Sequence, residues 1–245
     1  ICPAVFEADD HFRDVNGGAN RDKRIRRVIM DGKNFALLTD ETFDIIMNDS
    51  IYPGSGGSSA LYTYDHFLHC RERLADGGLF SCWVPLDLRP REMTMILRSF
   101  QEVFPHTSFW VASNCLNKHG LILGTLEPLE IDYRHIEAVM SRPGVAADLQ
   151  GIAIENPLDF IECFSLSEKA IRRLTVDGPL NTDNRPRLEF SCAVPANWED
   201  KLHQVLGILA EQLSPVSSHV VNLPEDGNAR RELARRFRAT RHIFR

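Results

Sequence analysis

One aspartate stands where a catalytic carboxylate would stand in an α/β protein. Residues 43–48 (FDIIMN) form a short, mostly apolar run, and Asp49 follows at once, ahead of a loop rich in glycine and serine. An apolar run of this length, bounded by turn residues, predicts a strand buried on both faces. Ligands of open α/β sheets bind beyond the carboxyl ends of the strands, so Asp49 could accept a proton from a substrate. The alternative is that Asp49 only caps the turn.

Two other groupings invite a chemical interpretation. His66 and His69 share one face of a predicted helix, beside Cys70, but no carboxylate completes a set of metal ligands. The glycine-rich stretch 54–57 could cradle a phosphate, but its spacing fits no phosphate-binding fingerprint. We therefore predict neither a metal site nor a phosphate loop.

Strands alternating with helices must position these residues. Such alternation up to residue 104 predicts a doubly wound, mainly parallel sheet, to which a terminal hairpin adds an antiparallel edge. Beyond residue 128 the pattern changes to short helices, with Asn197 as the expected N-cap of one of them. The predicted strands are 25–30, 43–48, 79–84, 107–112 and 121–125, with a strand-like segment at 186–191; the predicted helices are 3–15, 34–38, 62–74, 90–104, 131–140, 157–163, 166–174 and 198–213.

Composition narrows the class of protein. The chain has 245 residues, of which 43% are hydrophobic and 25% charged, as is ordinary for a globular protein. A formal net charge of -6 gives no indication of nucleic-acid binding, and no apolar run approaches the ~20 residues that span a bilayer. Six cysteines without CxxC pairing predict reduced, mostly buried thiols. We therefore expect a cytoplasmic protein.

Several motifs together resemble the spermidine synthase family, whose fold is that of class I S-adenosylmethionine-dependent methyltransferases. The matching strings cover roughly the first 190 residues; they are PAVFEADDHFRDVNGG, DGKNFALLTDETFDIIMNDSIYP, SALYTYDHF, LADGGLFSCWVPL and LRSFQEVFPHTSFW. NTDNRPRLEF, at residues 181–190, is similar to a signature of the bacterial members that are fused to a membrane segment.

The resemblance implies a Rossmann-like α/β fold and a division of the chain into three parts. These are a partial spermidine synthase or methyltransferase domain at 1–128, a helical extension at 129–195 and a helical tail at 196–245. The family's first strand and glycine-rich cofactor loop would lie before Ile1, so the sheet is expected to expose a hydrophobic edge, and this chain alone is expected to be inactive.

The resemblance also assigns roles to single residues. Asp49 matches the catalytic aspartate, which accepts a proton from, or orients, an amine that attacks a carbon beside a sulfonium. Asp31 and Gly32 match a pair at which the carboxylate accepts from the adenine amino group and the backbone approaches the ring; Asp31 as a helix N-cap is the alternative, and both can hold together. With Asp49 and Ser50 they are the implied contacts with S-adenosylmethionine or its decarboxylated form.

The acceptor side departs from the family pattern. The family's second acidic residue, three positions after the catalytic one, falls on Tyr52. A glutamine that contacts the amine falls on Trp83, and a tyrosine of the hairpin region falls on Asn114. A diammonium substrate needs anions at its distal end, so these substitutions disfavour putrescine and favour a flatter, less cationic acceptor. Tyr62 joins Tyr52 and Trp83 among the predicted substrate contacts.

Three functions stay open at this point. The first is a transferase of polyamine biosynthesis type that acts on an amine or a related acceptor. The second is a non-catalytic or truncated binding domain of the same fold, and the third is a methyltransferase with a non-polyamine acceptor. The expected partners are a small amine, a second copy in a homodimer and a membrane segment in a longer parent protein, but no nucleic acid and no metal.

Two polar segments have structural and functional interpretations. Asn181, Asp183 and Arg185 predict a structured loop, with a lid over the substrate as the alternative. The tail carries seven arginines from Arg230 onward, for which a solvated helix or linker is the commonest explanation. Contact with anionic lipid is the alternative if the parent protein is fused to a membrane segment.

Overall fold

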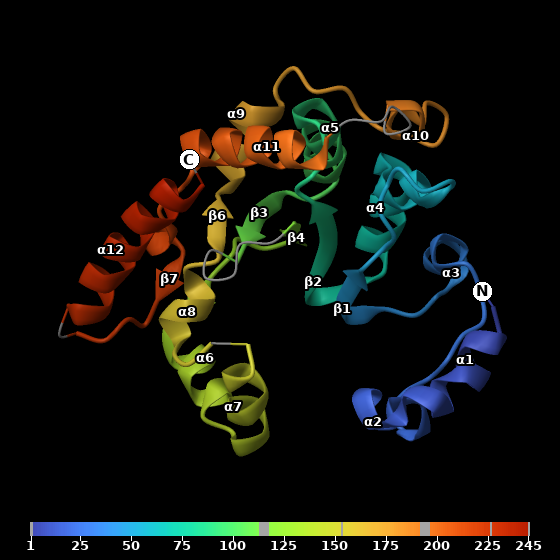
Figure 1. Cartoon of the computed structure of the whole chain (residues 1–245), viewed down its shortest axis with the longest axis horizontal. Coiled ribbons are helices and arrows are strands. Elements are labelled where there is room, and N and C mark those ends of the chain that lie inside the picture. The colour runs from blue at the N-terminus through green and yellow to red at the C-terminus, as the bar shows by residue number, and fades with distance from the viewer. Residues whose placement is uncertain (1, 113–117, 153, 192–196, 226, 245) are drawn as a thin grey trace. The chain divides into compact units, whose positions relative to one another are not determined.

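The computed structural model of the chain describes residues 2–112, 118–152, 154–191, 197–225 and 227–244. The chain divides into two units, Ile1–Asp40 and Glu41–Arg245 (Figure 1). The first unit contains short helices and an extended segment, and the second contains every strand that the structure describes.

In the first unit, the helix predicted at 3–15 is divided into three short consecutive helices. Gly17 and Gly18 end this helical region with φ of 61° and 70°, values that glycine adopts without strain. The predicted strand at 25–30 is wrong: the segment has no regular secondary structure, and none of its residues takes part in the sheet pairings of the described chain. A strand forms only against a hydrogen-bonded neighbour, which the apolar pattern by itself does not supply. The elements are α1 (Ala4–Ala8), α2 (Arg13–Asn16), α3 (Gly32–Leu38) and the 3-10 helices Asp9–Phe12 and Ala19–Arg21.

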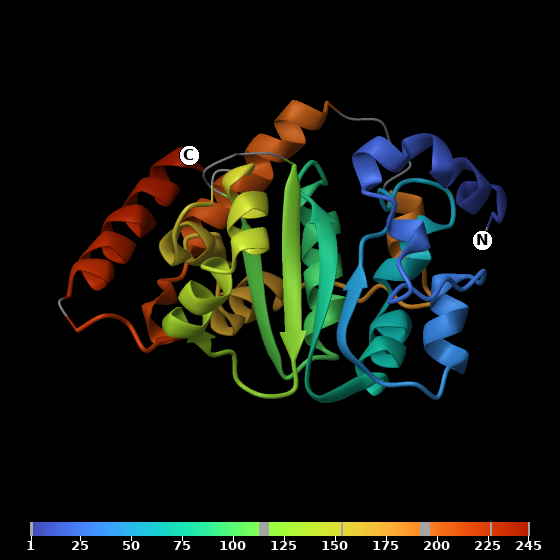
Figure 2. The same ribbon diagram turned by 90° about the horizontal axis from the view of Figure 1, so that it is seen from below.

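A five-stranded sheet organises the second unit (Figure 2). The strand order is β1-β2-β4-β3-β6; β1 is parallel to β2, whereas β4 lies antiparallel between β2 and β3. The strands β1, β2 and β3 therefore run in one direction, which confirms the Rossmann-like α/β class with its antiparallel hairpin. The strands are β1 (Phe43–Asn48), β2 (Leu74–Pro85), β3 (His106–Val111), β4 (His119–Thr125) and β6 (Phe164–Leu166), with a separate pair β5 (Ile131–Asp132) and β7 (Val220–Val221).

The helix α5 (Pro90–Gln101) packs against the sheet through an aromatic cluster. Phe80 of β2 stacks on Phe100 and Phe104, with ring centroids 5.5 and 5.4 Å apart. A Cβ atom at Gly124 of β4 would lie only 2.4 Å from Phe104 Cγ, so glycine is what lets these rings reach the strand. The other helices of the unit are α4 (Tyr64–Glu72), α6 (Tyr133–Met140), α7 (Pro143–Gln150), α8 (Pro157–Ile161), α9 (Glu168–Thr175), α10 (Arg187–Ser191), α11 (Trp198–Gln212), α12 (Asn228–Ile243) and the 3-10 helices Ser58–Tyr62 and Val216–Ser218.

The structure tests three further predictions made from the sequence. Burial of the 43–48 strand on both faces is wrong: Ile45 is 63% exposed and Met47 73%, and among the described strands β1 is at the edge of the sheet, paired with β2. The strand-like segment at 186–191 is the helix α10, whose Leu188 N–H donates to Asn181 Oδ1 and not to a strand. The N-cap at Asn197 is confirmed, since its side chain accepts from Glu199 N–H.

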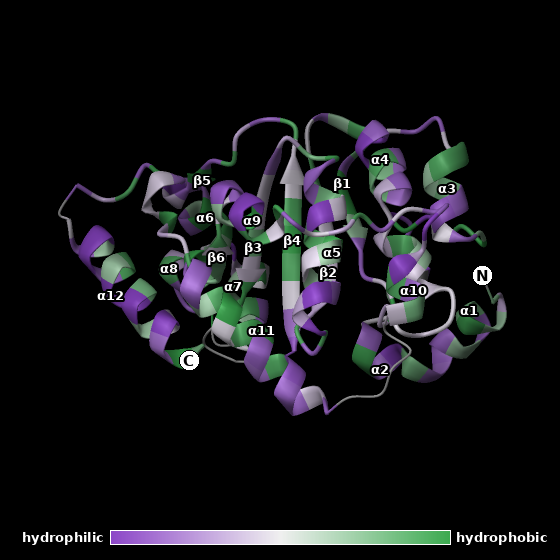
Figure 3. Ribbon diagram, turned by 90° about the horizontal axis from the view of Figure 1, so that it is seen from above, coloured by the Kyte–Doolittle hydropathy of each residue, from purple (hydrophilic) through white to green (hydrophobic). Residues whose placement is uncertain are grey.

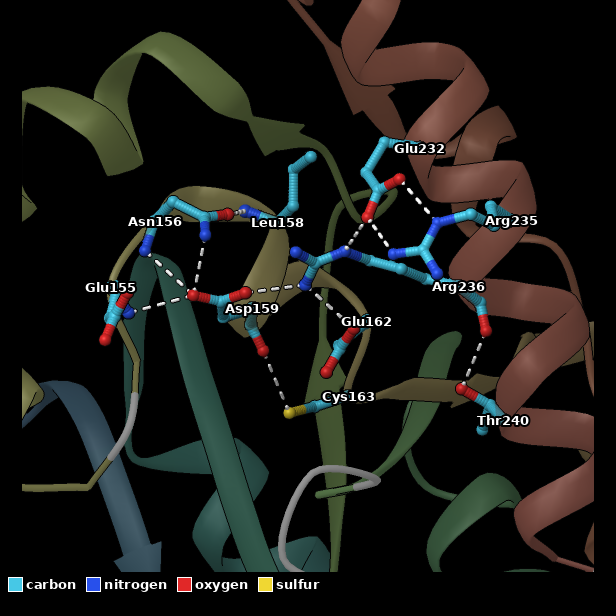
Figure 4. A network of polar contacts seen from close by, with 10 residues as sticks. All are labelled: Glu155, Asn156, Leu158, Asp159, Glu162, Cys163, Glu232, Arg235, Arg236 and Thr240. Atoms are coloured by element: carbon cyan, nitrogen blue, oxygen red, sulfur yellow. Dashed lines mark hydrogen bonds and ion pairs between the residues drawn. The ribbon is translucent and has the colours of Figure 1, made fainter.

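The arginine-rich tail folds as α12 and is attached to α8 by one of its arginines. Figure 3 shows that hydrophilic residues make up much of this helix. Arg236 lies with Nη1 2.6 Å from Asp159 Oδ1 and 2.9 Å from Glu162 Oε2, and its Nε is 2.9 Å from Glu232 Oε1 (Figure 4). The side chains of Arg236, Asp159 and Glu162 are each less than a fifth exposed. A partly buried ion network therefore holds the tail against the rest of the unit.

Replacing Arg236 by methionine is expected to lower the free energy of unfolding by about 2 kcal/mol, because two partly buried carboxylates lose their cation. Urea unfolding at neutral pH measures the change. Arg238→Met is the matched control: Arg238 is an exposed arginine of the same helix, and its loss should stay within about 0.5 kcal/mol. Equal stability of the two variants would contradict a structural role for the network.

The same network predicts how stability depends on acid. Hydrogen bonds from Arg235 and Arg236 lower the pKa of Glu232 to about 2. Burial acts to raise the pKa of Asp159, but hydrogen bonds from Arg236 and from two backbone N–H groups outweigh it and hold that pKa below its usual value. Carboxylates with lowered folded pKa values stabilise above their unfolded pKa and lose this contribution as the pH falls through the folded one. Between about pH 4.5 and 2, Arg236→Met should therefore lose stability less steeply than the unaltered protein.

Candidate functional site

Asp49 lies at the carboxyl end of β1, as the sequence predicts, and its side chain is exposed. The preceding Asn48 pairs in register with Cys82 of β2, and β2 continues for three residues beyond this pair, to Pro85. Asn48 Nδ2 donates to Leu61 O at 2.9 Å and to Cys82 Sγ at 3.3 Å. These bonds fix the strand end, and with it the position from which the Asp49 carboxylate reaches a ligand.

Ser50, the next residue, carries an unpaired hydroxyl. Its Oγ is buried and makes no hydrogen bond within the described part of the chain. Burial of a hydroxyl without a partner costs about 1–3 kcal/mol. A polar group of a ligand at this strand end would recover that cost, so the residue fits the cofactor contact that the resemblance implies.

The glycine-rich loop after Asp49 is tied to the distant helix α10. Ser59 Oγ donates to Glu189 Oε2 at 2.5 Å, and Gly57 N–H donates to Glu189 Oε1 at 3.3 Å. The bonds from Ser59 and Gly57 lower the pKa of Glu189, so the carboxylate is held charged. Tyr62 ends this loop fully buried, with its hydroxyl 3.5 Å from Ile51 O. Tyr62 thus supports the loop from the core, and its role as a substrate contact stays a prediction.

Polar side chains from four segments gather around Tyr52. The Tyr52 hydroxyl donates to Asp87 O and accepts from Lys201 Nζ, each at 3.4 Å. Lys118 Nζ lies 3.4 Å from Asp87 Oδ2 and 3.6 Å from the centre of the Trp198 ring. We call these five residues the Tyr52 cluster. Tyr52 follows β1, Asp87 follows β2 and Lys118 precedes β4, whereas Trp198 and Lys201 lie in the first turn of α11.

Four members of this cluster were not among the predicted site residues: Asp87, Lys118, Trp198 and Lys201. They come from three separate segments and share no motif. The one available signal was Asp87, a carboxylate that follows the end of β2 by two residues, much as Asp49 follows β1.

Trp83 of β2 has a fixed partner in β4. Its Nε1–H donates to His119 Nδ1 at 2.9 Å, which places the proton of a neutral His119 on Nε2. The two rings lie 5.8 Å apart between centroids, and Trp83 is half-buried. Its role as a substrate contact stays a prediction, and Asn114 lies outside the described residues.

Asp31 and Gly32 belong to the first unit. Asp31 Oδ1 accepts from Asn34 N–H at 3.0 Å, which confirms the N-cap on α3. A carboxylate has about four acceptor positions, so the cap leaves capacity for an amino group. Gly32 is exposed, and no atom lies within 4 Å of a Cβ placed there. Their contact with adenine stays a prediction.

The histidines and cysteines do not form a reactive centre in the described chain. No group of three potential metal ligands occurs among these residues. Cys70 Sγ lies 3.6 Å from His66 Nε2, and burial raises the pKa of Cys70 to about 12, which keeps it a thiol. Burial also raises the pKa of Cys82. No helix of the described residues is both long and apolar enough to cross a membrane.

Asn181 organises the NTDNRPRLEF segment. Its side chain is fully buried, donates through Nδ2 to Tyr62 O at 3.0 Å and to Ser59 O at 3.4 Å, and accepts from Leu188 N–H at 3.1 Å. Asp183 N–H donates to Asp65 Oδ2 at 2.8 Å. These contacts agree with the structural interpretation of the loop, and they connect it to the loop that follows Asp49.

Residues 9–119 match the family model of the spermine/spermidine synthase domain. The matched segment includes Asp49, Tyr52 and Trp83. The polyamine aminopropyltransferase of Serratia proteamaculans (strain 568) is 36% identical over 93 residues, which are 36% of this chain and 32% of that protein. The polyamine aminopropyltransferase of Buchnera aphidicola subsp. Schizaphis graminum (strain Sg) is 29% identical over 126 residues, 51% of this chain and 44% of that protein. Residues 9–119 are thus similar to the spermidine synthase family, and the chain spans less than half the length of both relatives.

Solved structures of the same kind show lower similarity. A probable spermidine synthase from Corynebacterium glutamicum ATCC 13032 gives a TM-score of 0.46 at 20% identity, over 66% of this chain and 56% of that one. The spermidine synthase from Thermotoga maritima gives 0.42 at 16% identity, over 83% of this chain and 58% of that one.

Proposed function

We propose that this chain forms the acceptor side of a spermidine-synthase-like aminopropyltransferase, with Asp49 as its base. The observation that carries the proposal is the position of Asp49: an exposed carboxylate at the end of β1, inside the segment that matches the spermine/spermidine synthase domain. The curated relatives that match this segment are polyamine aminopropyltransferases. The unpaired hydroxyl of the adjacent Ser50 supports a ligand at the same strand end.

The proposed reaction moves an aminopropyl group from sulfur to nitrogen. Decarboxylated S-adenosylmethionine supplies this group on a sulfonium. The acceptor ammonium gives one proton to Asp49 or to solvent, and its nitrogen then forms a bond to the methylene carbon beside the sulfur. The carbon–sulfur bond breaks with its electron pair going to sulfur, which leaves a neutral thioether and a secondary ammonium. When solvent takes the proton, Asp49 stays ionised, and its negative charge stabilises the positive charge that develops on the nitrogen.

A methyltransferase is the second candidate, and the acceptor side of the chain favours it. Tyr52 and Trp83 stand where family members carry amine contacts, so the acceptor differs from the usual diamine. Transfer of a methyl group from ordinary S-adenosylmethionine needs the same positioned carboxylate when the acceptor is protonated.

Calorimetric titration of the protein with decarboxylated and with ordinary S-adenosylmethionine separates the candidates. We expect heat with the decarboxylated form, and release of 5′-methylthioadenosine when an amine is added. Binding heat with ordinary S-adenosylmethionine alone would contradict the aminopropyltransferase and favour the methyltransferase. No heat with either would overturn the proposal in favour of a non-catalytic domain of the same fold.

A further inference from the structure

We infer that the acceptor of this site is an amine that carries a carboxylate at its far end, and that Lys201 binds this carboxylate. The inference rests on the proposed function and names its substrate class. A diamine bears two positive charges, so its far end needs an anionic or neutral acceptor group in the protein. An amino carboxylate needs a cation there instead.

The structure brings a cation to the point where a diamine would need an anion. Tyr52 lies three positions after Asp49, and Lys201 Nζ lies 3.4 Å from its hydroxyl. Lys201 comes from α11, 149 residues further along the chain, so tertiary packing and not local sequence places the ammonium here. A second ammonium, from the far end of a diamine, would be repelled at this position.

The neighbouring carboxylate does not neutralise Lys201. Asp87 Oδ2 pairs with Lys118 Nζ at 3.4 Å, and the Lys118 ammonium also lies over the Trp198 ring. Within the described chain, no carboxylate lies at ion-pair distance from Lys201. The charges of Asp87 and Lys118 therefore cancel, and the Tyr52 cluster has a net charge of +1, from Lys201.

The hydroxyl of Tyr52 can share the binding of an anion. It donates to Asp87 O over a long 3.4 Å contact, which a carboxylate oxygen could replace. A ligand oxygen between Lys201 Nζ and the Tyr52 hydroxyl would then accept from both groups. Charge-assisted bonds of this kind are stronger than those between neutral groups.

The short chain segment between Asp49 and Tyr52 limits the length of the acceptor. The two residues are three positions apart, so their Cα atoms are at most about 11 Å apart. A short amino carboxylate, with three or four methylenes between its charged ends, is therefore the acceptor to test. Such a ligand has nearly the shape of a diamine of the same length and differs from it in the sign of one charge.

The test compares two acceptors of matched shape, 4-aminobutanoate and 1,4-diaminobutane, as substrates of the protein with its sulfonium co-substrate. We expect kcat/KM to favour 4-aminobutanoate by about tenfold or more. Lys201→Glu is expected to reverse this preference, with a change of about 100-fold in the ratio of the two kcat/KM values. Lys169→Glu is the matched control: Lys169 is an exposed lysine of α9, and its charge reversal should leave the ratio unchanged.

The outcomes separate this inference from the proposed function. Turnover with a preference for the diamine, or an unchanged ratio in Lys201→Glu, would overturn the acceptor class and leave the transferase standing. The heat released when the sulfonium co-substrate binds tests the proposed transferase function separately. It should be equal in Lys201→Glu and in the unaltered protein. If neither acceptor reacts and no co-substrate binds, both proposals are wrong. Better turnover of O-phosphoethanolamine than of 4-aminobutanoate would overturn the carboxylate in favour of a phosphate.

Discussion

Asp49→Asn is expected to lower the kcat of aminopropyl transfer by about 10²- to 10⁴-fold, the usual contribution of a positioned general base. Asparagine keeps the shape of the side chain but cannot take the proton that the acceptor ammonium must lose before it attacks. It also removes the negative charge that faces the developing ammonium. Steady-state kinetics with saturating acceptor measures the change.

A second acidic residue of β1 provides the control. Asp44 is exposed on the same strand, so Asp44→Asn makes the same chemical change five residues away from the strand end. We expect its kcat to stay within about twofold of the unaltered value, because it touches no reacting group. Both variants should stay folded, because the side chains of Asp49 and Asp44 are exposed, and urea unfolding checks this. Normal turnover of Asp49→Asn would remove this residue from the mechanism.

The features that sequence predicted well are local. The alternation of strands and helices, the hairpin β3–β4 and the carboxylate after β1 all follow from patterns within about ten residues. The N-caps at Asp31 and Asn197 follow from a polar side chain directly ahead of a helical stripe. In each case the sequence pattern and the element that it predicts lie within the same short segment of the chain.

The features that sequence missed depend on partners far along the chain. Residues 25–30 have the composition of a strand but do not pair with any strand of the described chain. Lys201 meets Tyr52 across 149 residues and Glu189 meets Ser59 across 130, so neither contact leaves a spacing that can be recognised. The Tyr52 cluster therefore forms through the packing of α11, and the contact between Lys201 and Tyr52 could not be predicted from the sequence.

Asn181→Ala is expected to lower the free energy of unfolding by about 3–4 kcal/mol. The side chain of Asn181 is fully buried and accepts from Leu188 N–H while it donates to Tyr62 O. Truncation removes the acceptor of the buried Leu188 N–H and the bonds that Asn181 donates to Tyr62 O and Ser59 O, and each buried hydrogen-bonding group that loses its partner costs about 1–3 kcal/mol. Urea unfolding followed by circular dichroism measures the change.

Two further variants identify the cause of this loss. Thr182→Ala alters the adjacent residue, whose hydroxyl makes only an exposed turn bond with Arg185 N–H, so we expect a change below about 1 kcal/mol. Asn181→Asp keeps the acceptor for Leu188 but removes the donor to Tyr62 and buries a charge, so it should destabilise at least as much as alanine. Because Asn181 connects α10 to the loop after Asp49, hydrogen exchange should also quicken at residues 57–62 in both Asn181 variants. Exchange that stays slow there, with a loss of stability no larger than in Thr182→Ala, would mean that the NTDNRPRLEF segment does not hold this loop.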